Sequence, residues 1–311
     1  MDVKQFIYEK VSMIRETVGQ GRAINALSGG VDSSVVTALG HKAIGDQLET
    51  VFLDDGLMRE KEPETVVATF EPLGIPVRIV DLKDRFFSAL KGIEDPEEKR
   101  KAFRDTFYTC FGEIVKESGA SFLLQGTIKA DIIETQKGVK TQHNILEQIG
   151  IDPEAGYGFK VIEPLIELFK PDVRQIATGI GLPDAVAQRM PFPGPGLATR
   201  CLGEVNRERI EIVRKAVRIV EEETEDIPAF QCFAVLLKDR ATGLKKDGSR
   251  EFGHIIVVRC VESENAMTAE PVPLPWDVLR KLEHRIAGEI DEVSRVLYDL
   301  TPKPPATIEY I

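Results

Sequence analysis

The sequence lacks the features of membrane and secreted proteins. It contains no apolar run of about 18 residues, the length that a membrane-spanning helix requires. Its first residues, Met1 to Phe6, have neither the basic start nor the apolar core of a signal peptide. Internal repeats and low-complexity tracts are absent as well. We therefore expect a globular protein of the cytoplasm that does not contact a membrane.

Cysteine and histidine are scarce, with four of each in 311 residues. The cysteines stand at positions 110, 201, 232 and 260, so the C-x-x-C spacing of zinc and iron–sulfur sites does not occur. We expect buried, reduced thiols and no structural metal. The net charge of −11 argues against a large nucleic-acid surface, so we expect no nucleic-acid partner.

The first two thirds of the chain alternate short apolar segments with helical patterns. Residues 3–18 place apolar side chains at helical spacing, and further helices are expected at 63–70 and 96–118. Four apolar segments are expected to be strands: 23–27, 50–53, 77–80 and 122–125. Short buried strands separated by helices predict an α/β fold with a doubly wound parallel sheet. Ligands of such sheets bind at the carboxyl ends of the strands, where the segments 28–34, 54–56 and 125–127 fall.

The segment Ser28-Gly29-Gly30-Val31-Asp32-Ser33-Ser34 follows the first expected strand and precedes a helical stretch. Backbone N–H groups and a helix amino terminus then point at one spot, which suits a phosphate. The glycines let the backbone approach an anion closely, and one serine can cap the helix. Asp32 would repel a bare phosphate, so it fits beside a metal ion or as an acceptor that braces the loop. From these residues alone, a capped helix after a glycine turn remains an open interpretation.

The last third of the chain has a different pattern. Residues 190–197 are rich in proline and glycine, and by composition alone they indicate a linker between domains. Helices are expected at 206–223 and 276–293, and strands at 230–237, 254–261, 294–300 and 306–311. We therefore predict three parts: a nucleotide-binding domain at 1–188, a connector at 189–205 and a smaller α+β domain at 206–311.

The segment 28–34 resembles the pyrophosphate loop of the N-type ATP pyrophosphatases, which share an adenine nucleotide alpha hydrolase-like fold. Further segments resemble the ATP-pyrophosphatase part of GMP synthases. They are Gln125-Gly126-Thr127 with Asp131 to Glu134, the run from Arg189 to Val205, and the tail from Lys303 to Glu309. Because these segments lie in both expected domains, the resemblance covers nearly the whole chain. It replaces the linker interpretation of the proline- and glycine-rich stretch.

This resemblance implies the ATP-dependent amination of XMP to GMP, the final step of de novo guanine nucleotide synthesis. The C2 oxygen of XMP is adenylated with release of pyrophosphate, and ammonia then replaces AMP. The sequence contains no G-x-C-x-G turn, and we expect no amidotransferase domain before residue 1. The resemblance therefore implies the two-subunit form, in which a separate glutamine amidotransferase supplies ammonia. It also implies a homodimer formed through the C-terminal domain, with ATP and magnesium as cofactors.

The resemblance further implies which residues act. Asp131 and Glu134 stand at helical i, i+3 spacing, so both carboxylates can face one site. The implied catalytic residues are Asp32, Asp131, Glu134 and Lys140, with Asp32 as the magnesium ligand. The implied ATP-binding residues are Ser28, Gly29, Gly30, Val31, Asp32, Ser33, Ser34, Asp54 and Gly126. The implied XMP-binding residues are Arg100, Gly194, Pro195, Gly196, Lys303, Ile308 and Glu309.

Interpretations without a functional role remain open for several of these residues. Without the resemblance, Asp131 and Glu134 would fit a solvated helix face, and residues 99–101 a solvated run of charge. The chain also departs from the family pattern after His143-Asn144, where residues 145–150 are bulkier. Two alternatives therefore remain: an N-type pyrophosphatase acting on a different purine or on tRNA, or a non-catalytic regulatory protein that binds nucleotide.

Overall fold

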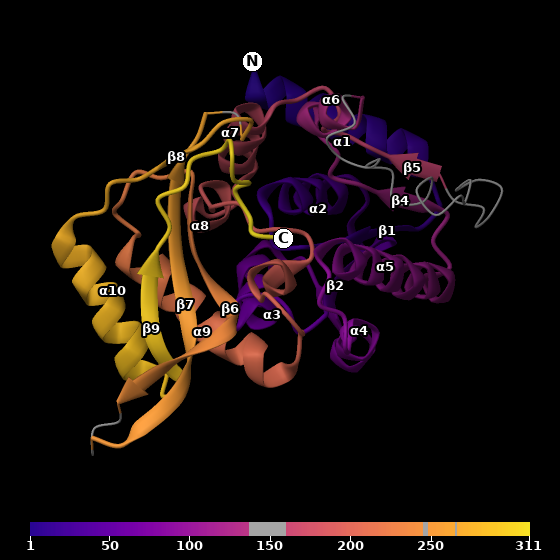
Figure 1. The fold of residues 1–311 in the computed structure, drawn as a ribbon. Helices are drawn as coiled ribbons and strands as arrows, with labels where there is room; N and C mark the ends of the chain where they lie inside the picture. The colour runs from indigo at the N-terminus through magenta and orange to yellow at the C-terminus, as the bar shows by residue number, and fades with distance from the viewer. Residues whose placement is uncertain (137–159, 245–247, 265) are drawn as a thin grey trace. The chain divides into compact units, whose positions relative to one another are not determined.

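The computed structural model describes residues 1–136, 160–244, 248–264 and 266–311 (Figure 1). The chain divides into two compact units. The amino-terminal unit comprises residues 1–54, 61–82 and 105–189, and the carboxy-terminal unit comprises residues 55–60, 83–104 and 190–311. Two segments that we expected in the first domain, 55–60 and 83–104, thus pack with the second unit.

The amino-terminal unit is built on a five-stranded parallel sheet. Its strands are β1 (Ala23–Ala26), β2 (Leu48–Asp54), β3 (Val77–Asp81), β4 (Phe122–Leu124) and β5 (Lys160–Ile162), in the order β3-β2-β1-β4-β5. Strands β2 and β3 lie on one side of β1, and β4 and β5, which come later in the sequence, lie on its other side. This reversal confirms the predicted doubly wound fold and makes the gap between β1 and β4 the switch point.

Apolar side chains explain why these segments form a buried sheet. Ile24, Val51 and Phe52 in the central strands are at most 1% exposed. Helix α1 (Val3–Val18) buries Ile7, Val11, Ile14 and Val18, the face that its helical spacing predicts. Helices α1, α2 (Val31–Ile44) and α7 (Lys170–Ile180) pack against one another, and α2 also contacts β1, β2 and β4.

The remaining helices before residue 206 differ widely in length. They are α3 (Glu62–Phe70), α4 (Lys83–Leu90), α5 (Pro96–Ser118), α6 (Lys129–Gln136) and α8 (Asp184–Ala187), with 3-10 turns at Gly45–Gln47, Glu71–Leu73 and Gly196–Arg200. Helix α5 belongs to the carboxy-terminal unit up to Arg104 and to the other unit beyond it. Within the described ranges, no helix is both long and apolar enough to cross a membrane.

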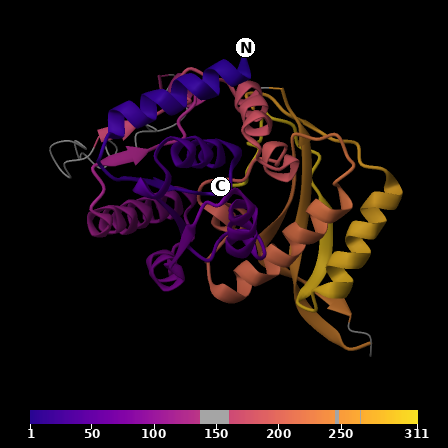
Figure 2. The ribbon, with the colours of Figure 1, turned by 180° about the vertical axis from the view of Figure 1, so that it is seen from behind.

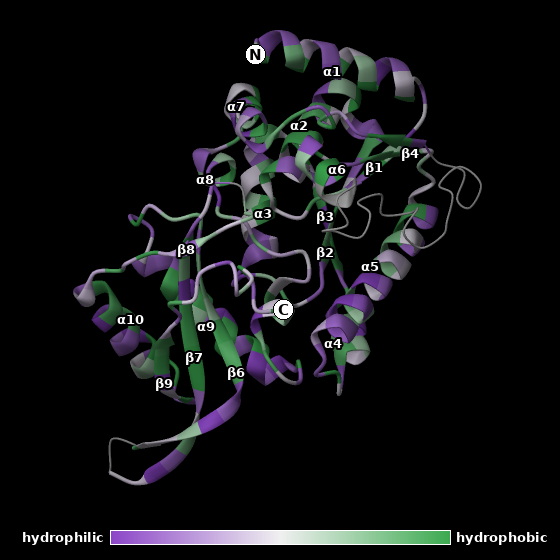
Figure 3. Ribbon diagram, turned by 45° about the horizontal axis from the view of Figure 1, so that its top comes forward, coloured by the Kyte–Doolittle hydropathy of each residue, from purple (hydrophilic) through white to green (hydrophobic). Residues whose placement is uncertain are grey.

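The carboxy-terminal unit is an α+β unit with a four-stranded mixed sheet. Its strands are β6 (Gln231–Leu244), β7 (Arg250–Glu262), β8 (Glu270–Pro271) and β9 (Val293–Tyr298), and β7 pairs with all three others. Helix α9 (Arg207–Glu223) packs on β6, and α10 (Trp276–Glu289) packs on α9 and β9 (Figures 1 and 2). Figure 3 shows that β6 and β7 are hydrophobic in their packed part and hydrophilic toward the hairpin that joins them.

Two predicted elements of this unit are wrong. The helix predicted at 276–293 ends at Glu289, because the chain turns and enters β9 at Val293. The strand predicted at 306–311 does not form. Carbonyl groups of this tail accept hydrogen bonds from the side chain of Arg259 instead of from a neighbouring strand.

The prediction of four reduced cysteines is also wrong for two of them. Cys232 and Cys260 form a disulfide, whereas Cys110 and Cys201 are free and buried. Cys232 on β6 lies directly opposite Cys260 on β7, and their Cα atoms are 4.1 Å apart. Such cross-strand neighbours are invisible to an argument from local spacing, because 28 residues separate them in the sequence.

Candidate active site

The loop between β1 and α2 carries the predicted ATP-binding motif. Gly29 adopts a φ of 77°, a conformation that glycine reaches without strain. Gly30 is the N-cap of α2 and no side chain caps this helix, so the expected serine cap does not form. Instead, Ser33 Oγ donates to the carbonyl of Gly30 at 3.0 Å and accepts from the amide of Ser28 at 3.2 Å. The loop is therefore braced from within.

The segment after β4 packs directly on this loop. A Cβ atom at Gly126 would lie 3.1 Å from the backbone carbon of Asp32 and 3.2 Å from the amide nitrogen of Ser33. A side chain at this position would push the loop backbone away by a few tenths of an ångström. The structure thus brings Gly126 and the loop together at the switch point between β1 and β4, as the parallel sheet predicts.

Asp32 lies beside two basic residues of α7. Lys170 Nζ donates to Asp32 Oδ2 at 2.5 Å, and Arg174 stands one helical turn beyond Lys170. Asp32 Oδ1 is buried and has no hydrogen-bond partner among the described residues. Burial raises the pKa of Asp32, an effect that the nearby Lys170 ammonium opposes. The site therefore holds a carboxylate that has been withdrawn from water and can accept a further positive charge.

Asp131 and its neighbours shape the other side of the switch point. Asp131 Oδ2 accepts from the amide of Ile128 at 3.0 Å and so caps the turn that leads into α6. The charge of Asp131 contributes to the raised pKa of Asp32, which indicates that the two carboxylates are neighbours. Thr127 Oγ1 donates to Glu163 Oε1 at 2.5 Å, which ties the end of β4 to the segment after β5.

Several predicted catalytic and ATP-binding residues are not placed by these contacts. Glu134 lies on α6, three residues after Asp131, and its side chain is outside the described part of the chain. Lys140 lies outside the described residues. Asp54 is the last residue of β2 and is only 6% exposed.

In the carboxy-terminal unit, the predicted XMP residue Glu309 is firmly held. Its carboxylate accepts from Arg200 Nη2 at 2.8 Å and Nε at 3.1 Å, and from Gln231 Nε2 at 2.7 Å. Arg200 is 1% exposed, and its guanidinium lies over the rings of Phe192 and Phe233. These contacts fix the orientation of the Glu309 carboxylate.

The tail that contains Glu309 is anchored by a second buried arginine. Arg259 on β7 is 0% exposed, and it donates to the carbonyls of Thr301, Thr307 and Ile308. It also pairs with Asp299 at 2.7 Å. The side chain of Ile308 packs into an apolar cluster that includes Phe233, Val235, Val257 and Val261. Lys303 Nζ donates to the carbonyl of Ala266 at 2.8 Å.

The other predicted XMP residues lie elsewhere in this unit. Arg100 is half exposed on α5 and pairs with Glu97 at 2.5 Å. Its neighbour Lys99 is not part of a solvated run, because it is only 2% exposed and donates to the carbonyl of Cys201 at 2.7 Å. The residues Gly194, Pro195 and Gly196 form a turn closed by a 3.0 Å hydrogen bond from the amide of Gly196 to the carbonyl of Pro193.

Comparisons with known proteins show which family the chain belongs to. The family description "GMP synthase C terminal domain" matches residues 200–310, and "NAD synthase" matches residues 2–106. A subunit of glutamine-hydrolyzing GMP synthase from Archaeoglobus fulgidus is 54% identical over 311 residues, which are 100% of both chains. The corresponding GMP synthase subunit of Pyrococcus horikoshii is 52% identical over 313 residues, again with 100% of both chains covered. The chain belongs to this family of GMP synthase subunits.

A further relative and a solved structure were also compared with the chain. The corresponding GMP synthase subunit of Methanocaldococcus jannaschii is 49% identical over 314 residues, covering 99% of each chain. Among solved structures, an NH3-dependent NAD synthetase from Campylobacter jejuni has 16% identity and a TM-score of 0.47, covering 63% of this chain and 80% of that chain. The family assignment rests on the full-length relatives.

Sequence reasoning missed several residues that this member of the GMP synthase family places around its candidate site. Arg189 and Arg200 stand inside the run from Arg189 to Val205 that carried the resemblance, but the resemblance did not predict their contacts. Gln231 and Arg259 lie on strands β6 and β7 and had no local signal. Long-range hydrogen bonds place these residues, and no local pattern encodes such bonds.

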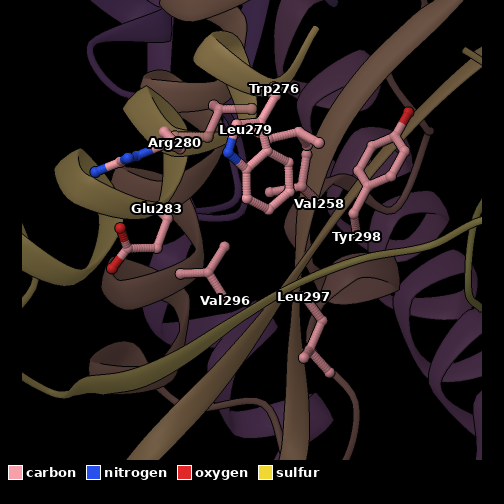
Figure 4. A pocket seen from close by; sticks show the side chains of 9 residues that line it. Val258, Trp276, Leu279, Arg280, Glu283, Val296, Leu297 and Tyr298 are labelled. Carbon is pink, nitrogen blue, oxygen red and sulfur yellow. The ribbon is translucent and has the colours of Figure 1, made fainter. Parts of the chain in front are cut away.

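A separate pocket lies on the carboxy-terminal unit between α10 and β9 (Figure 4). Trp276, Leu279, Tyr298, Arg280 and Glu283 are among its lining residues. None of the described residues predicted for catalysis, ATP binding or XMP binding lines it. The pocket is therefore not part of the candidate site.

Proposed function

We propose that the chain catalyses the ATP-dependent amination of XMP to GMP. The observation that carries this proposal is the glycine- and serine-bearing loop at the β1/β4 switch point, in a chain whose full-length relatives are named as subunits of GMP synthase. In the first step, the C2 oxygen of XMP attacks the α-phosphorus of ATP and pyrophosphate leaves. In the second step, ammonia attacks C2, AMP leaves, and a proton is lost to give the amino group of GMP.

In this proposal, the amino-terminal unit binds ATP. Backbone N–H groups of the loop and the start of α2 bind the pyrophosphate end, and Lys170 and Arg174 supply positive charge beside it. The loop and helix residues concerned are Ser28, Gly29, Gly30, Val31, Ser33 and Ser34, with Gly126 packed behind them. Asp54 at the end of β2 accepts from the ribose hydroxyls. Because phosphoryl transfer depends on positioning and charge, such groups are the main source of catalysis.

The residues around Asp32 fit a magnesium ion. Magnesium takes one or two carboxylates together with phosphate oxygens, and Asp32 Oδ1 is a buried acceptor without a partner among the described residues. When bound, the ion would offset the negative charge of the phosphates. Asp32 would hold it, and Asp131 adds negative charge nearby. Glu134 and Lys140 remain predicted catalytic residues that this geometry does not test.

The carboxy-terminal unit binds XMP in this proposal. The Glu309 carboxylate, held by Arg200 and Gln231, accepts from the N–H groups of the purine ring. Arg100, Lys303 and the turn at 194–196 receive the phosphate of XMP, and Ile308 contacts the purine. Ammonia comes from a separate glutamine amidotransferase subunit. We further propose that the protein works in the cytoplasm as a homodimer joined through this unit.

The decisive experiment supplies the purified chain with XMP, ATP, magnesium and ammonium chloride, without glutamine or a partner. Equal yields of GMP, AMP and pyrophosphate are expected. Release of pyrophosphate should require XMP, and Asp32→Ala should abolish it. Pyrophosphate release by the Asp32→Ala variant at the wild-type rate would refute the role of the loop. Binding of ATP without any XMP-dependent product would refute the proposed reaction and favour a regulatory protein.

A further inference from the structure

An ion pair with a buried carboxylate and a guanidinium that is 23% exposed lies directly behind the candidate pyrophosphate loop. Glu62, the first residue of α3, is 1% exposed, and Arg189 follows α8. Arg189 Nη1 and Nη2 each donate to one oxygen of the Glu62 carboxylate, both at 2.6 Å. Two parallel charged hydrogen bonds fix both position and angle, so the guanidinium is held rigidly. Both residues belong to the amino-terminal unit.

This ion pair contacts the loop at Gly29. Arg189 Nη1 also donates to the carbonyl oxygen of Gly29 at 3.2 Å. A Cβ atom built on Gly29 would lie 2.4 Å from Glu62 Oε1 and 3.1 Å from Arg189 Nη1. The hydrogen bond and the close approach are separate observations, and both show that the loop backbone rests on the ion pair.

Fixing this carbonyl has a consequence for the opposite side of the same peptide. A trans peptide is planar, and its C=O and N–H groups point in opposite directions. Because the Gly29 carbonyl points at Arg189, the N–H of Gly30 points away from Arg189. Within the described residues it reaches Ser28 Oγ at 3.4 Å, a long contact that leaves it available to a stronger acceptor.

We propose that Arg189, fixed by Glu62, is a positioning residue that aims the Gly30 N–H at a pyrophosphate oxygen of ATP. This inference rests on the proposed function of the loop. Arg189 acts through the peptide and does not itself touch the nucleotide. Lysine cannot replace it fully, because one ammonium group cannot pair with both carboxylate oxygens and also hold the Gly29 carbonyl at a fixed angle.

The energetics of the pair favour a positioning role over a purely stabilising one. Withdrawing the Glu62 carboxylate and most of the Arg189 side chain from water costs stability, and well-packed apolar residues of the same size are often as stable. An ion pair at this position therefore brings little stability that an apolar pair could not. Unlike an apolar pair, however, it donates a hydrogen bond of fixed direction to the carbonyl of Gly29.

The test compares Arg189→Met, Arg189→Lys and wild type by calorimetric binding of magnesium pyrophosphate and by steady-state kinetics with ammonia. Loss of a supporting contact of this kind typically costs about 10- to 100-fold in affinity or rate. We expect Arg189→Met to weaken pyrophosphate binding and to raise the KM for ATP by that factor. The KM for XMP should stay within about twofold, and Arg189→Lys should recover part of the loss.

Arg78→Met is the control, because Arg78 pairs with Glu49 at 2.9 Å in the same unit, its side chain is 45% exposed, and it lies outside the loop. This variant should bind pyrophosphate like wild type. Wild-type pyrophosphate affinity in Arg189→Met, or an equal rise of both KM values, would overturn the inference. If Arg189→Met does not fold, Arg189→Lys alone decides by the same criterion. Pyrophosphate binding tests the inference even if the wild type makes no GMP, so the two failures are distinguishable.

Discussion

Arg259 offers the most direct test of how the carboxy-terminal tail is held. The perturbation is Arg259→Met, which keeps much of the side-chain length and removes the guanidinium. In the native protein, this group donates to three tail carbonyls and to Asp299, and it is 0% exposed. Methionine leaves all four acceptors without their donor. Tyr310 still donates to Asp299 Oδ2 at 2.6 Å and the amide of Thr301 donates to Asp299 Oδ1 at 2.8 Å, so the carboxylate keeps two partners.

The expected magnitude follows from these contacts. Breaking a buried ion pair by removing one partner costs about 3–5 kcal/mol, because the remaining charge stays buried. Each buried carbonyl left unsatisfied costs a further ~1–3 kcal/mol unless water reaches it. Because Asp299 is 13% exposed and the tail lies near the surface, water will reach part of this set. We therefore expect a loss of about 3–5 kcal/mol in the free energy of unfolding.

The assay is guanidinium chloride denaturation followed by circular dichroism, with hydrogen exchange of tail amides read by mass spectrometry. Arg218→Met is the matched control, because Arg218 lies in the same unit with its side chain 33% exposed and pairs with Glu60, Glu222 and Glu289 at the surface. It should cost less than about 1 kcal/mol. Equal losses in the two variants, with unchanged exchange in the tail, would refute the argument that Arg259 anchors it.

Three further predictions concern the loop and the cysteines. Burial raises the pKa of Asp32, so the ionised carboxylate lowers the stability of the folded protein above that pKa. At pH 7, Asp32→Asn should therefore have a melting temperature at least as high as that of wild type. The difference should vanish as the pH falls toward the ordinary aspartate pKa of about 3.9. A less stable Asp32→Asn protein at pH 7 would contradict this. The Cys232–Cys260 disulfide spans 28 residues, so its reduction should lower the free energy of unfolding by about 3–4 kcal/mol. Alkylation of the unfolded chain without reduction should label only Cys110 and Cys201. Labelling of all four would exclude the bond. In Gly29→Ala, the new Cβ atom would clash with Glu62 and the residue would have an unfavourable positive φ. Position 119 has a φ of 63° but open space around it, so Gly119→Ala is the control. Gly29→Ala should lower the melting temperature and the pyrophosphate affinity more than Gly119→Ala, and equal effects would contradict this prediction.

Much of the fold could be predicted because its elements carry strong local signals. Helix α1 repeats apolar residues at helical spacing, and the buried strands β1 and β2 are short apolar segments bounded by polar ones. Strand β5 was missed because three residues are too few to show a period. Helix α10 was predicted to be too long because the apolar spacing continues past Glu289 into Ile290 and Val293.

The candidate site was predictable only where its chemistry is local. The loop at 28–34 combines the residues that an anion site requires within seven positions, so the sequence alone suggests a phosphate ligand. The partners of these residues come from far along the chain. Lys170 reaches Asp32 across 138 positions, and Arg200 reaches Glu309 across 109. Only the folded topology brings such pairs together, so no local pattern could reveal them.

Arginine recurs behind the groups that are proposed to bind substrate, and its chemistry explains why. Arg189 supports Gly29 in one unit, and Arg200 supports Glu309 in the other. A loop carbonyl and a carboxylate cannot be oriented by apolar packing, which has no direction, whereas the planar guanidinium fixes an angle as well as a distance. The desolvation cost of these buried charges is offset by hydrogen bonds on several N–H groups at once. It follows that a lysine at either position should keep the charge but lose the angle, so such variants should lose ligand affinity more than they lose stability.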